Sequence, residues 1–505
     1  MTDQETQEGG PQRALGLTTA ITIIVGAMIG SGIMILPADM LSLLPSPLWI
    51  MGIFVVAAIL TVLGSLTVAE LSGMYPKAGG QYVYLKEAFG PWAGYLFGWT
   101  NFWVIQTGTI AAVAAAFAKV AARFIALPGF AVPVTIGGTL LFKIPPYGQA
   151  FLAIAVVILL TAVNRFGVRI GAIISNLSTF AKAIGLTLVV LLVLFFFHGQ
   201  GNLFSANTPL HQVTELCSTP PDPPVPNCIQ SGLVGQAYTG PEIAQGFLLA
   251  LLLILFAYDG WYMATYVAHE MKNPQRDGPR ALLLAPLVTT GIYLAVAAVS
   301  MWAVTLPDSL AIHMGGTDYL SGKAVENAVG GWGVALVGLI ALVSIFGTTN
   351  AYVLTAPRIA YAQAKEGLFL RSMAKLDPRH GTPAYGSLLC GIWASILVMS
   401  GLYDALVASV IFAVFIFHVM TAVAHMRLRR TRPDAERSYR TPGGAIIPIL
   451  FGVTSLAIVV AALWWTEDQG GYRYKAIVDL AIIAMGIPAY FLTKRRMARS
   501  NAVES

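Results

Sequence analysis

Two short glycine-containing segments interrupt apolar stretches of the chain, and their peptide groups could bind a small molecule. The first, residues 26–33, contains Gly30-Ser31-Gly32, and the second, residues 256–261, contains Asp259-Gly260. A glycine costs a helix about 1 kcal/mol relative to alanine. Small residues four apart would also allow two helices to pack closely. The density of Gly-Ser-Gly and the recurrence of a second interruption favour two broken helices over packing alone.

A broken helix exposes peptide groups that have no partner within the helix. The N–H groups that follow the first break carry positive partial charge and suit a carboxylate, whereas carbonyls that end a half helix suit an ammonium group. An α-amino acid carries both groups at a fixed separation. Asp259 would offer its backbone carbonyl, and Phe256, directly before the second break, could close over the ligand as a gate.

Two charged side chains lie within apolar stretches. Lys182 is about a dozen residues from each end of its stretch, too far to reach water easily. It could be a tethered cation that bridges the first break in the place of a sodium ion, or a proton-exchanging group that couples transport. Alternatively, the span is shifted and Lys182 is interfacial. The Asp259 carboxylate could pair with a cation or cap a freed N–H group.

Three other residues each allow two interpretations. Glu70 could join a gate network with Arg358 or Lys77, or it could be a solvated residue at the membrane interface. Cys217 and Cys228 share one polar loop. They could form a disulfide in an oxidising compartment or remain free thiols.

The elements that position these residues are membrane-spanning helices. Of the 505 residues, 56% are hydrophobic and 11% are charged, and the mean hydropathy is +0.72, whereas soluble domains carry about 25% charged residues. Apolar runs of about 18 residues or more recur along the chain and must be helical in hydrocarbon. We predict an all-α membrane protein with about 12 spans, near residues 16–43, 47–73, 91–123, 148–165, 171–197, 241–270, 281–306, 331–364, 384–400, 403–427, 445–465 and 475–493.

The basic residues predict the orientation of these spans. Loops and termini on one predicted side hold 22 of the 30 Lys and Arg residues, and the opposite side holds 6. Because positive charge accumulates in cytoplasmic loops, we predict a multi-pass protein of the cell membrane with both termini in the cytoplasm. The net charge of +6 is thereby explained by topology, and no nucleic-acid partner is expected.

The order of the spans predicts an inverted repeat. The breaks lie in spans one and six, at corresponding places in two sets of five, and an odd number of spans inverts the second set, as in leucine-transporter-like folds. The predicted division is a tail 1–15, a first repeat 16–197, an outer loop 198–240, a second repeat 241–427, a basic link 428–444, two further spans 445–493 and a tail 494–505.

Several other classes of protein are disfavoured. The chain contains no GxxxxGK[ST] motif for ATP. Its seven His residues are scattered, so we expect no metal, no cofactor and no enzymatic site. A channel would need a continuous polar stripe, and a nutrient sensor would need a cytoplasmic output domain; we find neither pattern.

Over nearly its whole length the chain resembles the amino acid–polyamine–organocation superfamily, in particular its L-type amino acid transporter branch. The resemblance rests on residues 29–33, 70–98 and 256–274, on Lys182, and on the segments 358–367 and 439–442. It implies substrate binding by residues of both breaks. Amides of Ser31 and Gly32, next to Gly30, would bind the carboxylate. Carbonyls of Met28, Phe256 and Asp259, next to Gly260, would bind the amino group.

The resemblance also implies that Phe256 is an outer gate and that Lys182 replaces a sodium site. Animal members of the branch bind a single-span partner through a cysteine between spans three and four. Residues 124–147 contain no cysteine, so we do not expect such a heavy-chain-type partner.

The expected function is sodium-independent exchange of neutral L-amino acids by alternating access. A proton-coupled amino acid symporter with the same fold remains an alternative. A transporter of cationic amino acids or polyamines would need a carboxylate facing the side chain of the substrate. Asp259 is the one candidate that we identify in mid-span.

Overall fold

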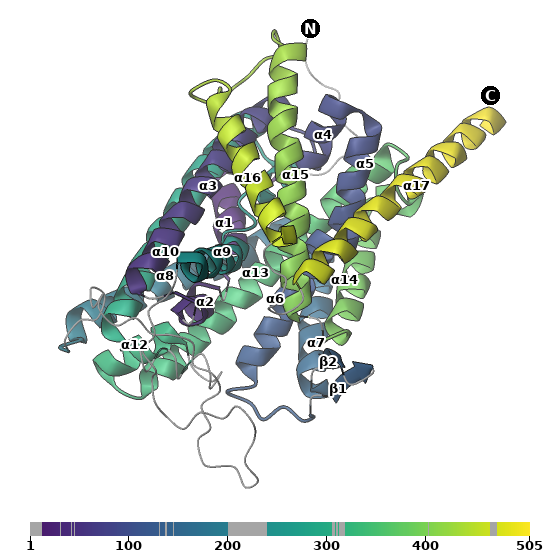
Figure 1. Cartoon of the computed structure of the whole chain (residues 1–505). Helices are drawn as coiled ribbons and strands as arrows, with labels where there is room; N and C mark the ends of the chain where they lie inside the picture. Colours follow the sequence, from purple (N-terminus) through teal and green to yellow (C-terminus); the bar gives the residue numbers. More distant parts are fainter. Residues whose placement is uncertain are drawn as a thin grey trace.

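The computed structural model describes residues 13–30, 32–41, 43–44, 46–130, 132–136, 139–144, 146–199, 240–305, 309, 312, 319–401, 403–464 and 472–504. Long helices run side by side through this part of the chain and form one bundle (Figure 1). The first helix begins and the last helix ends at the same end of the bundle, where the link 432–445 also lies. We call this end the basic end.

Eleven helical stretches of the described residues are long and apolar enough to cross a membrane. They are α1 (Leu17–Met28) with α2 (Gly32–Leu41), α3 (Pro47–Met74), α5 (Pro91–Thr100) with α6 (Gln106–Ala121), α7 (Tyr147–Arg165), α8 (Val168–Phe196), α9 (Gly240–Ala257), α10 (Pro274–Ala303), α13 (Trp332–Lys365), α15 (Tyr403–Thr431), α16 (Ile446–Trp464) and α17 (Tyr472–Glu504). The apolar helix α14 (Ala384–Met399) is shorter, with 16 residues. The predicted all-α membrane fold with about 12 spans is confirmed.

Shorter elements connect the long helices. Two are the helices α4 (Gln81–Phe89) and α12 (Leu320–Val329), and two are 3₁₀ segments, η2 (Met263–Glu270) and η3 (Arg371–Ala374). A π-helical turn, η1 (Asn101–Ile105), joins α5 to α6. An antiparallel hairpin of β1 (Val132–Ile136) and β2 (Thr139–Ile144) precedes α7, with an irregularity between Val134 and Thr135. None of these shorter elements was expected from the sequence.

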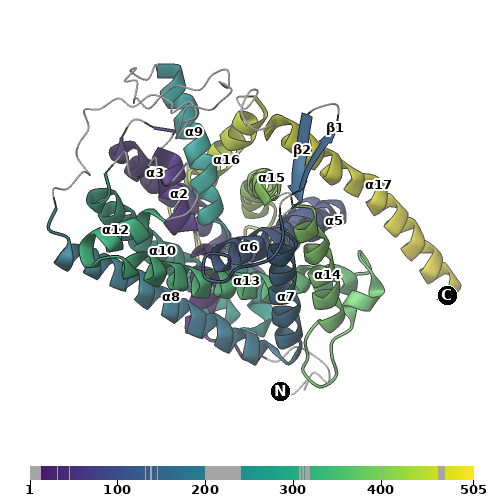
Figure 2. The same ribbon diagram turned by 90° about the horizontal axis from the view of Figure 1, so that it is seen from below.

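The perimeter of the bundle is apolar, as expected for a surface in contact with lipid. Large hydrophobic side chains such as Phe151 on α7 and Leu177 on α8 are 67% and 71% exposed. Figure 2 shows α8 and α17 along the outer sides of the bundle. The interior contains α13, which contacts α1, α6 and α8.

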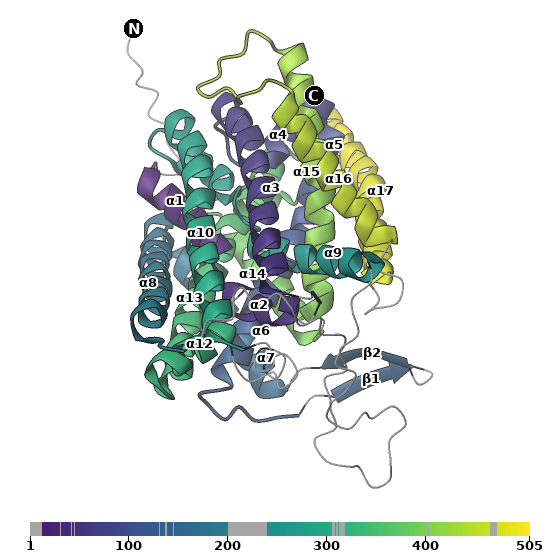
Figure 3. The ribbon, with the colours of Figure 1, turned by 60° about the vertical axis from the view of Figure 1, so that its left-hand side comes forward.

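The first and sixth spans are the interrupted ones. The first consists of α1 and α2 with a break between them. In the sixth, α9 lies across the long helices (Figure 3), and a turn leads from it to η2. The interruptions therefore occur at the residues where the glycines predicted them. The second half of the sixth span is a short 3₁₀ segment instead of an α-helix.

Candidate functional site

The first break lies at the centre of the bundle. Helix α1 ends at Met28, and the N–H group of Gly30 bonds to the carbonyl of Met28 at 2.9 Å before α2 begins at Gly32. The carbonyls of Gly26 and Ile29 consequently accept no backbone hydrogen bond within their own span. They point to neighbouring helices instead. Ser31 lies outside the described residues.

Lys182 of α8 supplies a cation to these free carbonyls. Its Nζ lies 2.9 Å from the Gly26 carbonyl oxygen and 2.6 Å from that of Ile29. It also lies 3.0 Å from the Ser344 carbonyl and 3.1 Å from the Thr348 hydroxyl, both on α13. The side chain is completely buried, with 0% exposure. The interpretation of Lys182 as an interfacial residue of a shifted span is therefore wrong.

Hydroxyl groups of α13 complete this arrangement. The Ser344 hydroxyl donates to the Ile29 carbonyl at 2.8 Å, and the Thr348 hydroxyl lies 2.8 Å from the Gly26 carbonyl. Because Ser344 and Thr348 are four residues apart, they face the break from consecutive turns of one helix. The first break is thus held open by one ammonium group and two hydroxyls from two neighbouring helices.

The second break has a different geometry. Helix α9 ends at Ala257, and the N–H group of Asp259 bonds to the Phe256 carbonyl at 3.2 Å. Gly260 has φ +89°, a conformation that glycine adopts without strain. A Cβ atom at Gly260 would lie 2.9 Å from the Cβ atom of Ala27. This glycine is therefore required both by the turn and by its contact with α1.

The two breaks are in direct contact. A Cβ atom at Gly32 would lie 2.7 Å from the Cβ atom of Ala257, so the start of α2 packs on the end of α9. The Tyr293 hydroxyl of α10 lies 2.6 Å from the Met28 carbonyl and 2.9 Å from the Ala257 carbonyl. One phenol thus joins the last peptide groups of the two half helices.

The Asp259 carboxylate is buried and accepts two phenol hydrogen bonds. Tyr262 donates to Oδ1 at 2.9 Å and Tyr352 donates to Oδ2 at 3.1 Å. Among the described residues, no Lys or Arg forms an ion pair with it. Asp259 also lines a cavity between the second break and the helices α3, α15 and α16.

The predicted site residues are partly brought together. Met28, Gly30, Gly32, Asp259 and Gly260 lie at the two touching breaks. Phe256 precedes Ala257, the last residue of α9, and is half-buried. The possible disulfide between Cys217 and Cys228 falls outside the described residues. No group of three potential metal ligands occurs among the residues that the structure describes.

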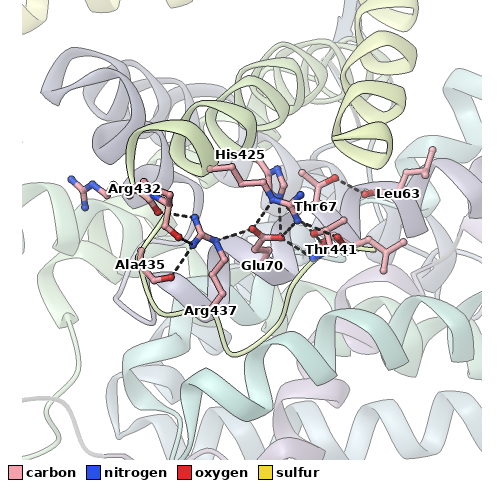
Figure 4. Close-up of polar contacts among 11 residues, drawn as sticks. Leu63, Thr67, Glu70, His425, Arg432, Ala435, Arg437 and Thr441 are labelled. Carbon is pink, nitrogen blue, oxygen red and sulfur yellow. Dashed lines mark hydrogen bonds and ion pairs between the residues drawn. The ribbon is translucent and has the colours of Figure 1, made fainter. Parts of the chain in front are cut away.

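Glu70 was assigned to the wrong partners. The sequence suggested Arg358 or Lys77, or exposure to solvent, but the carboxylate is 0% exposed. Arg429, at the end of α15, donates to both of its oxygens, and Arg437 of the link donates to Oε1 at 3.1 Å (Figure 4). The N–H group of Thr441 and the His425 ring also contact it, at 2.7 Å and 3.2 Å. We call this group of residues the Glu70 clamp.

Arg358 instead joins α13 to the second break. Its Nε lies 3.2 Å from Glu270 Oε1 at the end of η2, and both side chains are buried. Next to this pair, Leu15 and Met271 form a parallel bridge between the start of the chain's described part and the segment after η2. Backbone and ionic contacts therefore join the segments that lie between the breaks and the basic end.

Sequence reasoning missed several residues at the breaks. Tyr293, Ser344, Thr348, Tyr262 and Tyr352 all contact a peptide group or carboxylate of a break. Their common signal is a hydroxyl in the interior of an apolar helix, but many such hydroxyls bond only to their own helix, as Thr349 does.

A bundle of apolar helices in which two interrupted spans meet at the centre is the architecture of a secondary transporter. Comparison with known sequences identifies the family within this class. Residues 15–487 match the amino acid permease family, and the chain belongs to it. This result confirms the predicted membership of the amino acid–polyamine–organocation superfamily and its L-type branch.

Three relatives illustrate the similarity. The b(0,+)-type amino acid transporter 1 of Mus musculus is 30% identical over 95% of this chain and 88% of its own length. The serine/threonine exchanger SteT of Bacillus subtilis is 27% identical over 98% of this chain and 99% of its own. The large neutral amino acids transporter small subunit 2 of Homo sapiens is 28% identical over 95% and 80%. These relatives are amino acid transporters and not enzymes.

Proposed function

We propose that this chain is a sodium-independent exchanger that carries neutral L-amino acids across a membrane by alternating access. The observation that carries the proposal is the position of Lys182. Its ammonium group forms hydrogen bonds with the carbonyls of Gly26 and Ile29 and with the hydroxyl of Thr348. Carbonyls of an unwound span are the oxygen ligands that a coupling sodium ion uses in related architectures. A resident cation at this place removes the need for a sodium ion.

The substrate would bind where the two breaks touch. In this proposal, the amides of Ser31 and Gly32 hold the carboxylate, and the carbonyls of Met28, Phe256 and Asp259 hold the amino group. The positive end of α2 favours the carboxylate. Because the Met28 carbonyl accepts a hydrogen bond from Tyr293 in this structure, substrate binding would require Tyr293 to donate to the Ala257 carbonyl instead.

Exchange and neutral substrates are supported by the relatives. Their names describe a serine/threonine exchanger and a transporter of large neutral amino acids. We expect uptake of labelled threonine or leucine into liposomes that contain the purified chain only when unlabelled amino acid is inside. Replacement of sodium by potassium should leave the rate unchanged.

Two results would change the proposal. Uptake into empty vesicles that is driven by a pH gradient would identify a proton-coupled symporter with the same fold. A strict requirement for sodium would contradict the role of Lys182. The vesicles without internal amino acid and without a pH gradient are the control for leakage.

A second candidate function is transport of cationic amino acids, and Asp259 favours it. Its carboxylate is buried, the residue lines a cavity, and no Lys or Arg among the described residues forms an ion pair with it. An arginine or lysine side chain would provide one. If the wild-type chain exchanges arginine and Asp259→Asn loses arginine but retains leucine exchange, this candidate replaces the first.

We also propose that the chain works in the cell membrane without a single-span partner, with its basic end in the cytoplasm. The proposal is supported by the lack of cysteine in residues 124–147. Exchange by the purified chain alone would agree with it. Activity that appears only after addition of a membrane extract would contradict it.

A further inference from the structure

The start of the described chain is bound to the end of the sixth span. The N–H group of Leu15 donates to the Glu270 carbonyl at 3.0 Å, and the N–H group of Lys272 donates to the Leu15 carbonyl at 2.9 Å. The bridge between Leu15 and Met271 is parallel, so the chain before Leu15 is directed towards η2. Residues 1–12, which precede the described part of the chain, are therefore attached next to η2.

At this place η2 is in contact with α13. Arg358 of α13 pairs with the buried Glu270, and Tyr361 of α13 stacks on His269. The Nζ atom of Lys365, the last residue of α13, lies 5.7 Å from the centroid of the Tyr361 ring. We call this contact the η2–α13 interface. Because η2 lies between the second break and the basic end, that end can open only if the interface separates.

Exposed cations lie on both sides of the η2–α13 interface. Lys365 is on the α13 side, and Lys272 and Arg276 are on the other side, just after η2 and in the first turn of α10. Among the described residues, none of the three forms an ion pair. We call Lys272, Arg276 and Lys365 the interface cations.

Neighbouring acidic residues do not balance this charge. Asp277, in the first turn of α10, is buried at 7% exposure, and Glu366 pairs with Lys86. The N–H groups at the start of α10 add positive partial charge beside Arg276. The described residues thus leave a positive surface at the interface, and this surface fits an anionic partner.

Residues 1–12 have the composition of such a partner. They contain Asp3, Glu5 and Glu8 and no Lys or Arg. Apart from Met1 they carry no large apolar side chain, so charge and not burial determines what they bind. An extended segment of this length spans at most about 40 Å. Its attachment at Leu15 gives it a local concentration on the order of millimolar at the interface.

We propose that the acidic segment 1–12 docks on the interface cations and holds the η2–α13 interface closed. Its carboxylates join the two sides of the interface, and the bridge at Leu15 keeps the segment beside them. Anionic lipid headgroups have a suitable charge too, but they are not attached at this place. The docking does not depend on the proposed function, whereas its effect on the rate of exchange does.

Cross-linking tests the docking without any transport. In a protein whose three native cysteines are replaced by serine, Gln7→Cys and Asn273→Cys leave every carboxylate of the segment and every interface cation in place. We expect a short bismaleimide to join most chains at low ionic strength and few at about 1 M salt, where charges are screened beyond about 3 Å. In the matched control, Lys494→Cys replaces Asn273→Cys, because Figure 2 shows α17 on the opposite side of the bundle from α10. The control should give little product at either salt concentration.

The initial rate of alanine exchange in liposomes tests the effect on the interface. We expect neutralisation of the segment to raise the rate about threefold at low ionic strength, since a few exposed ion pairs contribute modestly. At about 1 M salt the variant and the wild type should exchange at the same rate. The variant carries Asp3→Asn, Glu5→Gln and Glu8→Gln.

Neutralisation of the interface cations should raise the rate by the same factor. This variant carries Lys272→Gln, Arg276→Gln and Lys365→Gln. The matched control removes three other exposed cations of the described chain that form no ion pair there, and its rate should equal that of the wild type. It carries Arg430→Gln, Lys494→Gln and Arg495→Gln.

The outcomes separate docking, lipid binding and the proposed function. A cross-link that forms equally at both salt concentrations, or not at all, would overturn the docking. Equal rates in all variants would overturn its effect on the interface. If neutral interface residues changed the rate only in vesicles that contain phosphatidylglycerol, and a neutral segment changed nothing, the partner would be lipid and the proposal wrong. A chain that is cross-linked as expected but exchanges no amino acid would contradict the proposed function alone.

Discussion

At the scale of single residues, Lys182 determines whether the first break is stable in an apolar interior. Its ammonium group donates hydrogen bonds to the carbonyls of Gly26, Ile29 and Ser344 at 2.6–3.0 Å. We expect Lys182→Met, which keeps the length of the side chain, to lower amino acid exchange by more than tenfold. A buried carbonyl that loses its partner costs about 1–3 kcal/mol.

The measurement is the initial rate of exchange in liposomes, normalised to the amount of inserted protein. Lys323→Met is the matched control, because Lys323 is partly exposed and pairs with Glu326 on the same short helix. A Lys182→Met protein that exchanges amino acids at the wild-type rate would assign Lys182 a purely structural role.

Gly32 permits the contact between the two breaks. We expect Gly32→Ala to abolish exchange, because its Cβ atom would lie 2.7 Å from the Cβ atom of Ala257, closer than packed side chains approach. At Gly30, the corresponding Cβ atom would meet only Thr348, at 3.7 Å, an ordinary contact distance. Gly30→Ala should therefore have the smaller effect, in the same assay and at equal expression. Equal loss in both variants would show that chain flexibility, and not contact, is required.

The charged residues inside the spans could be identified from the sequence, but the residues that contact them could not. Lys182 was identified because a charge in mid-span is rare. Ser344 and Thr348 were missed because hydroxyls in helices usually bond to their own backbone. Glu70 was given the wrong partners because Arg429 and Arg437 come from the distant end of α15 and from a link whose path no periodicity describes.

At the scale of elements, the Glu70 clamp joins α3 and α15 to the link that precedes α16. We expect Arg437→Ala to lower the melting temperature of the purified protein clearly more than Arg432→Ala. The side chain of Arg437 is 5% exposed, and a hydrogen bond to a charged partner such as Glu70 is worth about 1.5–3 kcal/mol. Arg432 pairs with Glu87 at 46% exposure, and such surface pairs contribute about 0–1 kcal/mol. Equal melting temperatures would show that the clamp adds no stability.

Opening of the basic end requires η2 to move away from α13, because η2 lies between the second break and that end. His269 of η2 stacks on Tyr361 of α13, with ring centroids 6.3 Å apart. A short bis-methanethiosulfonate cross-linker, which forms a disulfide with each cysteine and releases methanesulfinate, should therefore stop exchange when it joins His269→Cys to Tyr361→Cys. Reduction should restore the rate to that of the same protein before cross-linking.

The matched control joins α3 to the link at a position next to the Glu70 clamp. A Cβ atom at Gly73 would lie 2.5 Å from the Ser438 hydroxyl, so Gly73→Cys and Ser438→Cys can form a disulfide. Exchange should continue in this cross-linked protein, since a carboxylate as buried as Glu70 is costly to separate from its cations in every cycle. If both cross-links stopped exchange, the Glu70 clamp would have to move during the transport cycle.

The position of each break was predictable, but its conformation was not. Gly30 and Gly32 mark the first break because three small residues weaken a helix at one place. The sequence after Gly260 is apolar and suits an α-helix, yet η2 is a 3₁₀ segment. Two contacts hold η2 in this conformation: Tyr262 bonds to Asp259, and Arg358 bonds to Glu270. Tertiary contacts of this kind override local preference.

At the scale of the whole molecule, the count and order of the spans followed from hydropathy, because bilayer thickness fixes the length of a spanning helix. The predicted relation between the two sets of five spans came from the breaks in spans one and six and from the odd number of spans in each set. The cavity beside Asp259 could not be predicted, because part of its wall comes from α16, a span outside the predicted repeats.

The orientation of the molecule can be tested with one cysteine at each end of the bundle. Asp434 is exposed in the link at the basic end, and Phe130 is 75% exposed between α6 and the hairpin at the other end. In a protein whose three native cysteines are replaced by serine, a membrane-impermeant maleimide added to intact cells should label Phe130→Cys. It should label Asp434→Cys only after the membrane is permeabilised, because the 22 Lys and Arg residues on the predicted inner side resist transfer across the bilayer. The reverse pattern would place the basic end outside, and α2, with the proposed carboxylate-binding amides, would then face the cytoplasm.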